Sequence, residues 1–284
     1  MMTVPVLSYA KLRKKKQSLL FYAEKLVSLH KVLRFNNQTL TSMQALILAA
    51  GLGTRLRPLT DSKPKALVEI EGRTLLEINI KKLISYGADH IVVNVHHFAD
   101  KVIDYINSHT WNADIYISDE SGTLLDTGGA IAHAISLFEA NKPVLIHNVD
   151  IISSIDISEL LSHHQKHAPF ATLAVSKRHT NRQLLFNDNQ LIGWHDNRTD
   201  QYQWATPQMI QSNKHTELAY SGISVLSWQF IQSLPNATQA YPLVPCLLKA
   251  AANHSVIPYE HDAGIWLDVG KPETLALAKK LITK

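Results

Sequence analysis

Residues 49–65 hold the side chains best suited to bind phosphate. Small residues that leave the backbone open to a ligand follow an apolar run: Ala49, Ala50, Gly51 and Gly53. Consecutive backbone N–H groups in such a turn can surround phosphate oxygens. Arg55 and Lys65 then add two mobile positive charges. The segment therefore predicts a phosphate-binding loop, and an ordinary tight turn between a strand and a helix is the alternative.

Two common phosphate-binding motifs do not describe this loop. A dinucleotide fingerprint, G-x-G-x-x-G, would need glycine at position 56, which is Leu56. The pattern G-x-x-x-x-G-K-[ST] occurs nowhere in the sequence. The loop therefore belongs to neither of these two classes of nucleotide site.

Two aspartates stand at the ends of short apolar runs. Asp150 follows the run 144–147, and Asp268 follows Ile265 and Trp266. Two carboxylates could converge on one Mg²⁺, which prefers oxygen ligands and keeps water and phosphate in its remaining positions. Each aspartate could instead cap the helix that follows it, and spacing alone favours this second interpretation.

The elements that must position these residues alternate between short apolar runs and helical stretches. Such alternation is typical of an α/β fold with a Rossmann-like, mostly parallel sheet flanked by helices. We expect strands at 45–48, 90–95, 114–118, 143–147 and 171–175, and helices at 75–84, 100–108, 129–138, 242–252 and 272–282. Gly87 is a candidate helix C-cap and Asp156 a candidate N-cap. After residue 180 the pattern becomes irregular, with short strands at 184–186, 191–194 and 219–226, and this change predicts a mixed substrate-binding half.

Charge divides the 284 residues into two parts. Residues 1–42 contain eight Lys or Arg and one acid, which gives this segment a charge of +7. Because the net charge of the whole chain is +4, the remainder carries −3. We expect a basic N-terminal extension at 1–42 and a single compact domain at 43–284. The extension either forms a helix or precedes the native start at Met43. The acidic body argues against nucleic-acid binding. A single cysteine and the lack of a long apolar run predict a cytoplasmic protein without a transmembrane segment.

Four segments together resemble the sugar-1-phosphate nucleotidyltransferases. They are residues 46–60 with 63–67 (LILAAGLGTRLRPLT and KPKAL), 126–131 (DTGGAI), 144–150 (VLIHNVD) and 266–274 (WLDVGKPET). The resemblance spans nearly all of the body and none of residues 1–42. It is strongest to short members such as N-acetylmuramate-1-phosphate uridylyltransferases and mannose-1-phosphate guanylyltransferase-like proteins. Many relatives have glycine before the first metal aspartate, whereas this chain has Val149.

The resemblance implies that a nucleoside triphosphate reacts with a sugar 1-phosphate to give a nucleotide sugar and pyrophosphate. Catalysis of this kind depends on positioning two polyanions and neutralising charge. By resemblance, Arg55 faces the β- and γ-phosphates and Lys65 steadies the α-phosphate or the sugar phosphate. The resemblance also favours Asp150 and Asp268 as ligands of Mg²⁺, the expected cofactor.

Further residues are candidates for contacts with the two substrates. The predicted nucleotide contacts are Ala49, Ala50, Gly51, Gly53, Thr54, Asn94, Asp126, Thr127 and Gly128, with His96 a weaker candidate. Gly128 and Gly129 open a predicted helix whose N-terminus can receive an anion or let a nucleoside lie against the backbone. The predicted sugar contacts are Ser221 and Gly222, with Asn181 and Arg182 as weaker candidates. The sugar candidates could equally be ordinary strand and turn residues.

The identity of the base is not readable from spacing. The similarity to short uridylyltransferases favours UTP, and GTP use of the mannose-1-phosphate guanylyltransferase type is the alternative. A non-catalytic protein that binds a nucleotide or nucleotide sugar and regulates a partner is a hypothesis of a different class. The expected partners are thus a nucleoside triphosphate and a sugar 1-phosphate.

Overall fold

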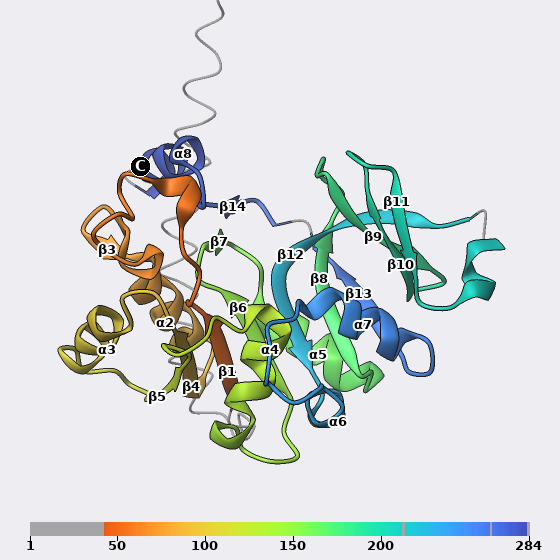
Figure 1. The fold of residues 1–284 in the computed structure, drawn as a ribbon, viewed down its shortest axis with the longest axis horizontal. Helices are drawn as coiled ribbons and strands as arrows, with labels where there is room; N and C mark the ends of the chain where they lie inside the picture. The colour runs from red at the N-terminus through yellow and green to blue at the C-terminus, as the bar shows by residue number, and fades with distance from the viewer. Residues whose placement is uncertain (1–42, 212–213, 262, 283–284) are drawn as a thin grey trace, which may run out of the picture.

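The computed structural model describes residues 43–211, 214–261 and 263–282, so the predictions for segment 1–42 lie outside the described residues (Figure 1). One ten-stranded sheet organises the described part. Its strands are β1 (Met43–Leu48), β4 (Ala88–Val95), β5 (Asp114–Asp119), β6 (Val144–Asn148), β8 (Ala171–Ser176), β9 (Arg182–Asn187), β10 (Gln190–Asp196), β11 (Gln201–Trp204), β12 (Thr216–Leu226) and β13 (Val256–Glu260). Two small ladders accompany it, β2 (Glu69–Ile70) with β3 (Arg73–Thr74) and β7 (Ile151–Ser153) with β14 (Trp266–Asp268).

Helices cover both faces of the sheet. They are α2 (Leu75–Ser85), α3 (Ala99–Asn107), α4 (Asp126–His133), α5 (Ile157–His167), α6 (Trp228–Gln232), α7 (Leu243–Ala251) and α8 (Pro272–Ile282). Four 3₁₀ turns join them, η1 (Thr54–Leu56), η2 (Lys65–Leu67), η3 (Ala134–Leu137) and η4 (Pro207–Gln211). None of the helices in the described ranges has the length and apolar character needed to span a bilayer.

Strands β6, β1, β4 and β5 form the parallel half of the sheet. Alternate residues of β1 point to opposite faces, as the pleat of a strand requires. Ala45 and Ile47 pack in the cluster that contains residues of α2, α3, α5 and α8, whereas Leu46 packs in the cluster that contains residues of α4, α6 and α7. Burial on both faces explains why these strands appear in the sequence as continuous apolar runs.

The other half of the sheet is largely antiparallel. Strand β12 pairs antiparallel with β6, β8 and β9, and β9, β10 and β11 continue outward as antiparallel neighbours. In Figure 1 these last three strands lie at the right, away from α2 and α3. The predicted α/β class, with a parallel sheet and a mixed half, is confirmed.

Several local predictions need correction. The helix predicted at 129–138 begins at Asp126, and its second half is the 3₁₀ turn η3. The short strand expected at Ile265 and Trp266 is confirmed as β14. The ladder β2·β3, the strand β7 with its pairing to β14, and the strand β13 were not predicted, because two or three residues carry no readable periodicity and β13 contains Pro258. The Asp156 cap is confirmed, since its Oδ1 accepts hydrogen bonds from the N–H groups of Ser158 and Glu159.

Candidate functional site

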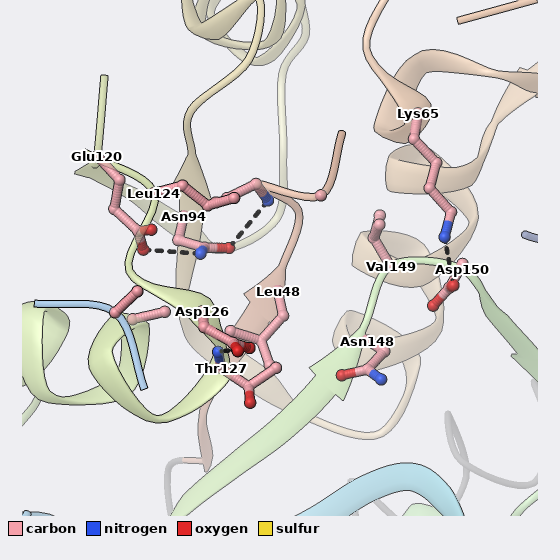
Figure 2. A pocket seen from close by; sticks show the side chains of 14 residues that line it. Leu48, Lys65, Asn94, Glu120, Leu124, Asp126, Thr127, Asn148, Val149 and Asp150 are labelled. Atoms are coloured by element: carbon pink, nitrogen blue, oxygen red, sulfur yellow. Dashed lines mark hydrogen bonds and ion pairs between the residues drawn. The ribbon is translucent and has the colours of Figure 1, made fainter. Parts of the chain in front are cut away.

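A cavity of about 380 Å³ opens at the carboxyl ends of the parallel strands (Figure 2). Open α/β sheets commonly bind ligands at this edge. The lining includes many predicted site residues and several others: Leu48, Ala50, Gly51, Lys65, Asn94, Glu120, Leu124, Asp126, Thr127, Ala130, Asn148, Val149, Asp150 and Ala240.

Three cavity residues lie side by side across the sheet. Leu48 ends β1 and is in register with Asn94 of β4 on one side and Asn148 of β6 on the other. Residues in register on parallel strands point to the same face, here the face covered by α4. Beyond Asn148, the neighbouring strand β12 contributes Gly222, whose φ is 74°. Asn94, Leu48 and Asn148 form the strand-end edge of the cavity, and Gly222 lies beside Asn148.

Asn94 fixes the start of the glycine loop rather than presenting a free amide. Its Oδ1 accepts hydrogen bonds from the N–H groups of Ala49 (2.6 Å) and Ala50 (3.3 Å). Its Nδ2 donates to Oε1 of Glu120 at 2.8 Å, and Figure 2 shows these two side chains facing each other. Because both ends of its amide are occupied, Asn94 positions the start of the loop and the Glu120 side chain.

The open backbone amides of the loop lie slightly later than predicted. Asn94 accepts from the first two amides, so the expectation that Ala49 and Ala50 offer free N–H groups is wrong. The N–H groups of residues 51–55 donate to no acceptor within the described ranges. Buried Leu56 anchors the loop, and Thr60 donates to the carbonyl of Gly53 at 2.8 Å. Gly53 is needed there, since its φ is 66° and a Cβ would lie 2.9 Å from Thr60.

The two predicted cations meet the two predicted aspartates at one end of the cavity region. Lys65 Nζ pairs with Asp150 Oδ2, and Figure 2 shows the two side chains facing each other. Arg55 Nη2 lies 3.7 Å from Asp268 Oδ2. A Cβ at Gly270 would lie within 3.1 Å of Arg55, Asp268 and Lys65, so a glycine is required where they converge.

A short ladder explains how carboxylates so distant in the chain come together. Asp268 pairs with Ile151 in the antiparallel β7·β14 ladder, directly after Asp150. The N–H of Val269 donates to the carbonyl of Asp150 at 2.9 Å, and Gly270 N–H donates to Asp268 Oδ1 at 2.8 Å. The ladder thus holds both aspartates, and neither is a helix N-cap by side-chain hydrogen bond.

Two side chains of helix α2 donate hydrogen bonds to the backbone of the turn that contains Asp150. Buried Asn79 donates to the carbonyl of Val149 at 2.8 Å, and Lys82 donates to the carbonyl of Ser153 at 2.9 Å. Burial lowers the pKa of Lys82 to about 8, although Asp156 partly opposes this. One hydrogen bond before Asp150 and one after it therefore hold the backbone of this turn in place.

The charges at this end disfavour a lone, ionised Asp150. Burial and the adjacent Asp268 carboxylate raise the Asp150 pKa, while Lys65 opposes the shift. A divalent cation would relieve the same repulsion. Both side chains offer only oxygen donors, and within the described residues no cluster of three or more His, Cys, Asp or Glu is placed to hold a metal. Carboxylate oxygens of this kind are ligands that Mg²⁺ accepts alongside water and phosphate.

The start of α4 differs from its predicted role. The N–H groups of Gly128 and Gly129 both donate to the carbonyl of Tyr241, at 2.9 and 3.2 Å. The prediction that this helix start receives an anion is wrong for these amides, because that carbonyl already occupies them. A Cβ at Gly128 would lie 2.6 Å from the Tyr241 ring, so close packing explains this glycine. Asp126 and Thr127 do line the cavity.

The predicted sugar residues are not all exposed to the cavity. Ser221 is fully buried, and its Oγ contacts His261 Nε2 at 2.7 Å and Arg178 Nη1 at 3.2 Å. Gly222 adjoins Asn148, while the exposed Asn181 contributes a carbonyl to the N–H of Asn197. Arg182 lies 3.5 Å from Asp196 on the antiparallel half.

Arg178 is a residue that the sequence analysis missed. Its guanidinium stacks 3.7 Å from the ring centre of Trp266 and donates to the carbonyls of Ala219 and Tyr220. It thereby joins β12 to the strand that ends at Asp268. Its position just past the end of β8 was a usable signal, as was that of Glu120 past β5. His96, the weaker candidate, contacts the carbonyl of Glu120 through Nδ1 at 2.7 Å.

Comparison with known proteins identifies the family of this chain. A family model described as nucleotidyl transferase matches residues 44–184. N-acetylmuramate alpha-1-phosphate uridylyltransferase of Caulobacter vibrioides is 32% identical over 246 residues, which cover 83% of this chain and 95% of that protein. Mannose-1-phosphate guanyltransferase of Aspergillus oryzae is 28% identical over 236 residues, which cover 81% of this chain and 62% of that protein.

Solved structures agree on the fold. The inositol-1-phosphate CTP transferase from T. maritima has a TM-score of 0.68 at 19% identity and covers 86% of this chain and 96% of that one. HddC from Yersinia pseudotuberculosis, complexed with GMP-PN, has a TM-score of 0.65 at 21% identity. The match covers 84% of this chain and 99% of that one. The identity and extent of the match to the Caulobacter protein show that this chain belongs to the sugar-1-phosphate nucleotidyltransferase family.

Proposed function

We propose that this enzyme uses UTP and a sugar 1-phosphate to make a UDP-sugar and pyrophosphate, with Mg²⁺ held by Asp150 and Asp268. The observation that carries the proposal is the convergence of Arg55 and Lys65 on these carboxylates beside the cavity. The preference for UTP is supported by the extended match to a protein named as a uridylyltransferase. GTP remains the alternative, because guanyltransferases also match.

In the proposed reaction, a phosphate oxygen of the sugar 1-phosphate attacks the α-phosphorus of the triphosphate. A new P–O bond forms as the bond between the α-phosphorus and the bridging oxygen breaks, and pyrophosphate leaves with that oxygen. Lys65 and Arg55 would offset the negative charge on the phosphoryl oxygens, and the open amides of residues 51–55 would donate to the triphosphate. Mg²⁺, when bound, would neutralise charge shared between the two substrates.

Loop geometry supports the placement of the triphosphate. The open amides and Arg55 follow the carboxyl end of β1 directly, whereas the Asn94–Glu120 pair lies one strand away. We place the phosphates at the Lys65 end and the base at the Glu120 end. Burial raises the pKa of the Glu120 carboxyl, which lines the cavity. Its Oε1 accepts from Asn94 Nδ2 and its Oε2 from the N–H of Leu125, so each oxygen keeps one lone pair for a ligand. Either uracil or guanine carries a ring N–H that such an oxygen could accept.

The test is pyrophosphate release from each nucleoside triphosphate with a panel of sugar 1-phosphates and Mg²⁺. We expect turnover with at least one pair and a much lower rate for Asp150→Asn. Asp188→Asn is the matched control, because it makes the same change at an exposed turn on the antiparallel half. Folded wild-type protein that turns over no pair would refute the proposal, and nucleotide binding without turnover would favour a regulator.

A further inference from the structure

His147 is a fully buried histidine that the proposed reaction does not use. It lies in β6, in register with Ile47 of β1 and Ile223 of β12. Both isoleucines belong to the apolar cluster that contains residues of α2 and α5, so His147 points to the face of the sheet opposite α4. It does not line the cavity, and any effect on the site must pass through the backbone that it contacts.

The contacts of this imidazole define which nitrogen carries the proton. Nδ1 lies 2.9 Å from the carbonyl oxygen of Asn148. A carbonyl oxygen can only accept, so Nδ1 carries a proton and donates it. Burial, together with the nearby charge of Lys82, lowers the pKa of His147 to about 3, so the imidazole is neutral at physiological pH. Nε2 is then a bare acceptor, and it has no hydrogen-bond partner among the described residues.

The unpartnered Nε2 makes a histidine unfavourable for the fold at this position. A buried acceptor that has lost its water and gained no partner costs free energy. Leucine is of similar size and would avoid this cost on a face lined by Ile47 and Ile223. Packing alone therefore does not explain His147, whereas the hydrogen bond from Nδ1 gives it a role.

The carbonyl that His147 holds begins the turn that carries Asp150, and Figure 2 shows residues 148–150 in sequence at the end of β6. The carbonyls of residues 148, 149 and 150 each accept a hydrogen bond, from His147, Asn79 and Val269 respectively. The N–H of Val149 donates to the carbonyl of Leu48 at 3.1 Å. Both polar groups of the peptide that joins residues 148 and 149 are therefore fixed, immediately before Asp150.

The direction of the Asp150 side chain follows from this backbone. Its carboxylate pairs with Lys65 and, in the proposed function, binds the divalent cation. Groups that orient a metal ligand typically change metal affinity by about 10- to 100-fold when they are removed. We propose that His147 is a positioning residue, whose Nδ1–H group holds the Asn148 carbonyl and thereby aims the Asp150 carboxylate at the cation. This inference rests on the proposed function.

Two conservative substitutions separate the roles of the two ring nitrogens. The amide of asparagine can place an N–H group near the position of Nδ1, whereas the longer glutamine places it near Nε2. His147→Asn should therefore keep the bond to the Asn148 carbonyl, and His147→Gln and His147→Leu should lose it. The matched control is His164→Leu. His164 is also buried and contacts Thr172 Oγ1 through Nδ1 at 2.9 Å, but it lies in α5 and does not line the cavity.

The first measurement is the Mg²⁺ concentration that gives half-maximal pyrophosphate release. It should rise roughly tenfold in His147→Leu and His147→Gln, and stay near the wild-type value in His147→Asn and His164→Leu. The Tm of His147→Leu should equal or exceed that of wild type, because the unpartnered acceptor is gone. A purely structural role predicts instead that activity falls only where Tm falls. Equal Mg²⁺ dependence in the asparagine and glutamine variants would overturn the inference.

Two further measurements do not require turnover. Nitrogen-15 NMR of wild type, with the signal assigned by its loss in His147→Asn, should show an Nδ1–H tautomer that does not titrate between about pH 5 and 8. An Nε2–H tautomer would overturn the inference. Thermal shifts with UTP, with and without Mg²⁺, measure the stabilisation that the metal adds. This increment should shrink in His147→Leu and persist in His147→Asn, and an undiminished increment in His147→Leu would also overturn the inference.

The failure of this inference is distinguishable from the failure of the proposed function. Absence of turnover in wild type with every pair of substrates would refute the proposed function. The tautomer of His147 can still be measured in that case. Turnover in wild type with unaltered Mg²⁺ dependence in His147→Leu would refute the positioning role alone.

Discussion

The two halves of the sheet treat polar side chains differently. In the parallel half, Asn148 and Asp150 at the end of β6 and Lys65 at the start of η2 gather beside a cavity. In the antiparallel half, His195 lies 3.1 Å from Asp200 and 3.5 Å from Glu217, so its polar contacts are made within the same surface. Strand ends of a parallel sheet all emerge at one edge, whereas an antiparallel sheet distributes polar groups over an exposed face. The candidate site therefore lies where topology, rather than polar content, brings the groups together.

The sharpest test of this difference compares one lysine from each half. Lys65 is 11% exposed and pairs with Asp150, whereas Lys177 is 71% exposed and lies 2.9 Å from Glu260. Lys65→Met should lower kcat by roughly 10² to 10³, because it removes a charge at the reacting phosphates. Lys177→Met should stay within about twofold. Steady-state pyrophosphate release measures both, and similar losses in the two variants would contradict the comparison.

Much of the parallel half could be predicted from sequence, because burial on both faces makes its strands continuous apolar runs. The loop and Asp150 were predictable for the same reason, since each follows such a run, whereas Lys65 was predicted as a cation in the segment that continues from the loop. The meeting of Asp150 with Asp268 was not readable from the residues alone. It depends on β7 and β14, which have three residues each and pair only in the folded chain.

Other misses came from competition for hydrogen bonds. The sequence shows that Gly128 can open a helix but not that the Tyr241 carbonyl takes its amide. In the same way, Asn94 takes the first amides of the loop and shifts the open amides to residues 51–55. Long-range partners of this kind have no local pattern. Strand-end position alone, however, would have nominated Arg178 and Glu120.

A second test concerns the buried support beneath Asp150. The pKa of Lys82 falls to about 8 in the fold, while an unfolded lysine titrates near 10.5. Between these values the unfolded chain binds more protons, so the free energy of unfolding should rise with pH, by at most about 3 kcal/mol. Urea titrations across this range measure the slope. Lys82→Met should remove it.

The matched control is Lys81→Met, on the next residue of the same helix. Lys81 is 61% exposed and pairs with Glu77, so its removal should leave the alkaline slope unchanged. Tyrosines that titrate at high pH are present in all three proteins and cancel in the comparison. A slope that survives in Lys82→Met would show that the charge of this lysine is not suppressed by burial.

The smallest expected effect lies on the antiparallel half, at the ion pair of Arg198 with Asp196. Arg198 Nε donates to Asp196 Oδ1 at 3.0 Å, and Nη2 donates to Oδ2 at 2.6 Å. Hydrogen bonds from Arg198 hold the Asp196 pKa below its ordinary value, so their stabilisation is present near neutral pH and fades as pH falls below about 4. Because Arg198 is exposed, salt should screen much of the effect.

Arg198→Ala should therefore leave kcat/KM for both substrates unchanged and lower Tm only slightly, at neutral pH and low salt. The difference in Tm from wild type should shrink at high salt and at acidic pH, which scanning calorimetry can follow. A fall in kcat/KM approaching that of Lys65→Met would break the comparison, because it would place a polar pair of the antiparallel half in the chemistry. An unchanged rate would instead confine catalysis to the strand ends of the parallel half, with the outer strands acting as a frame.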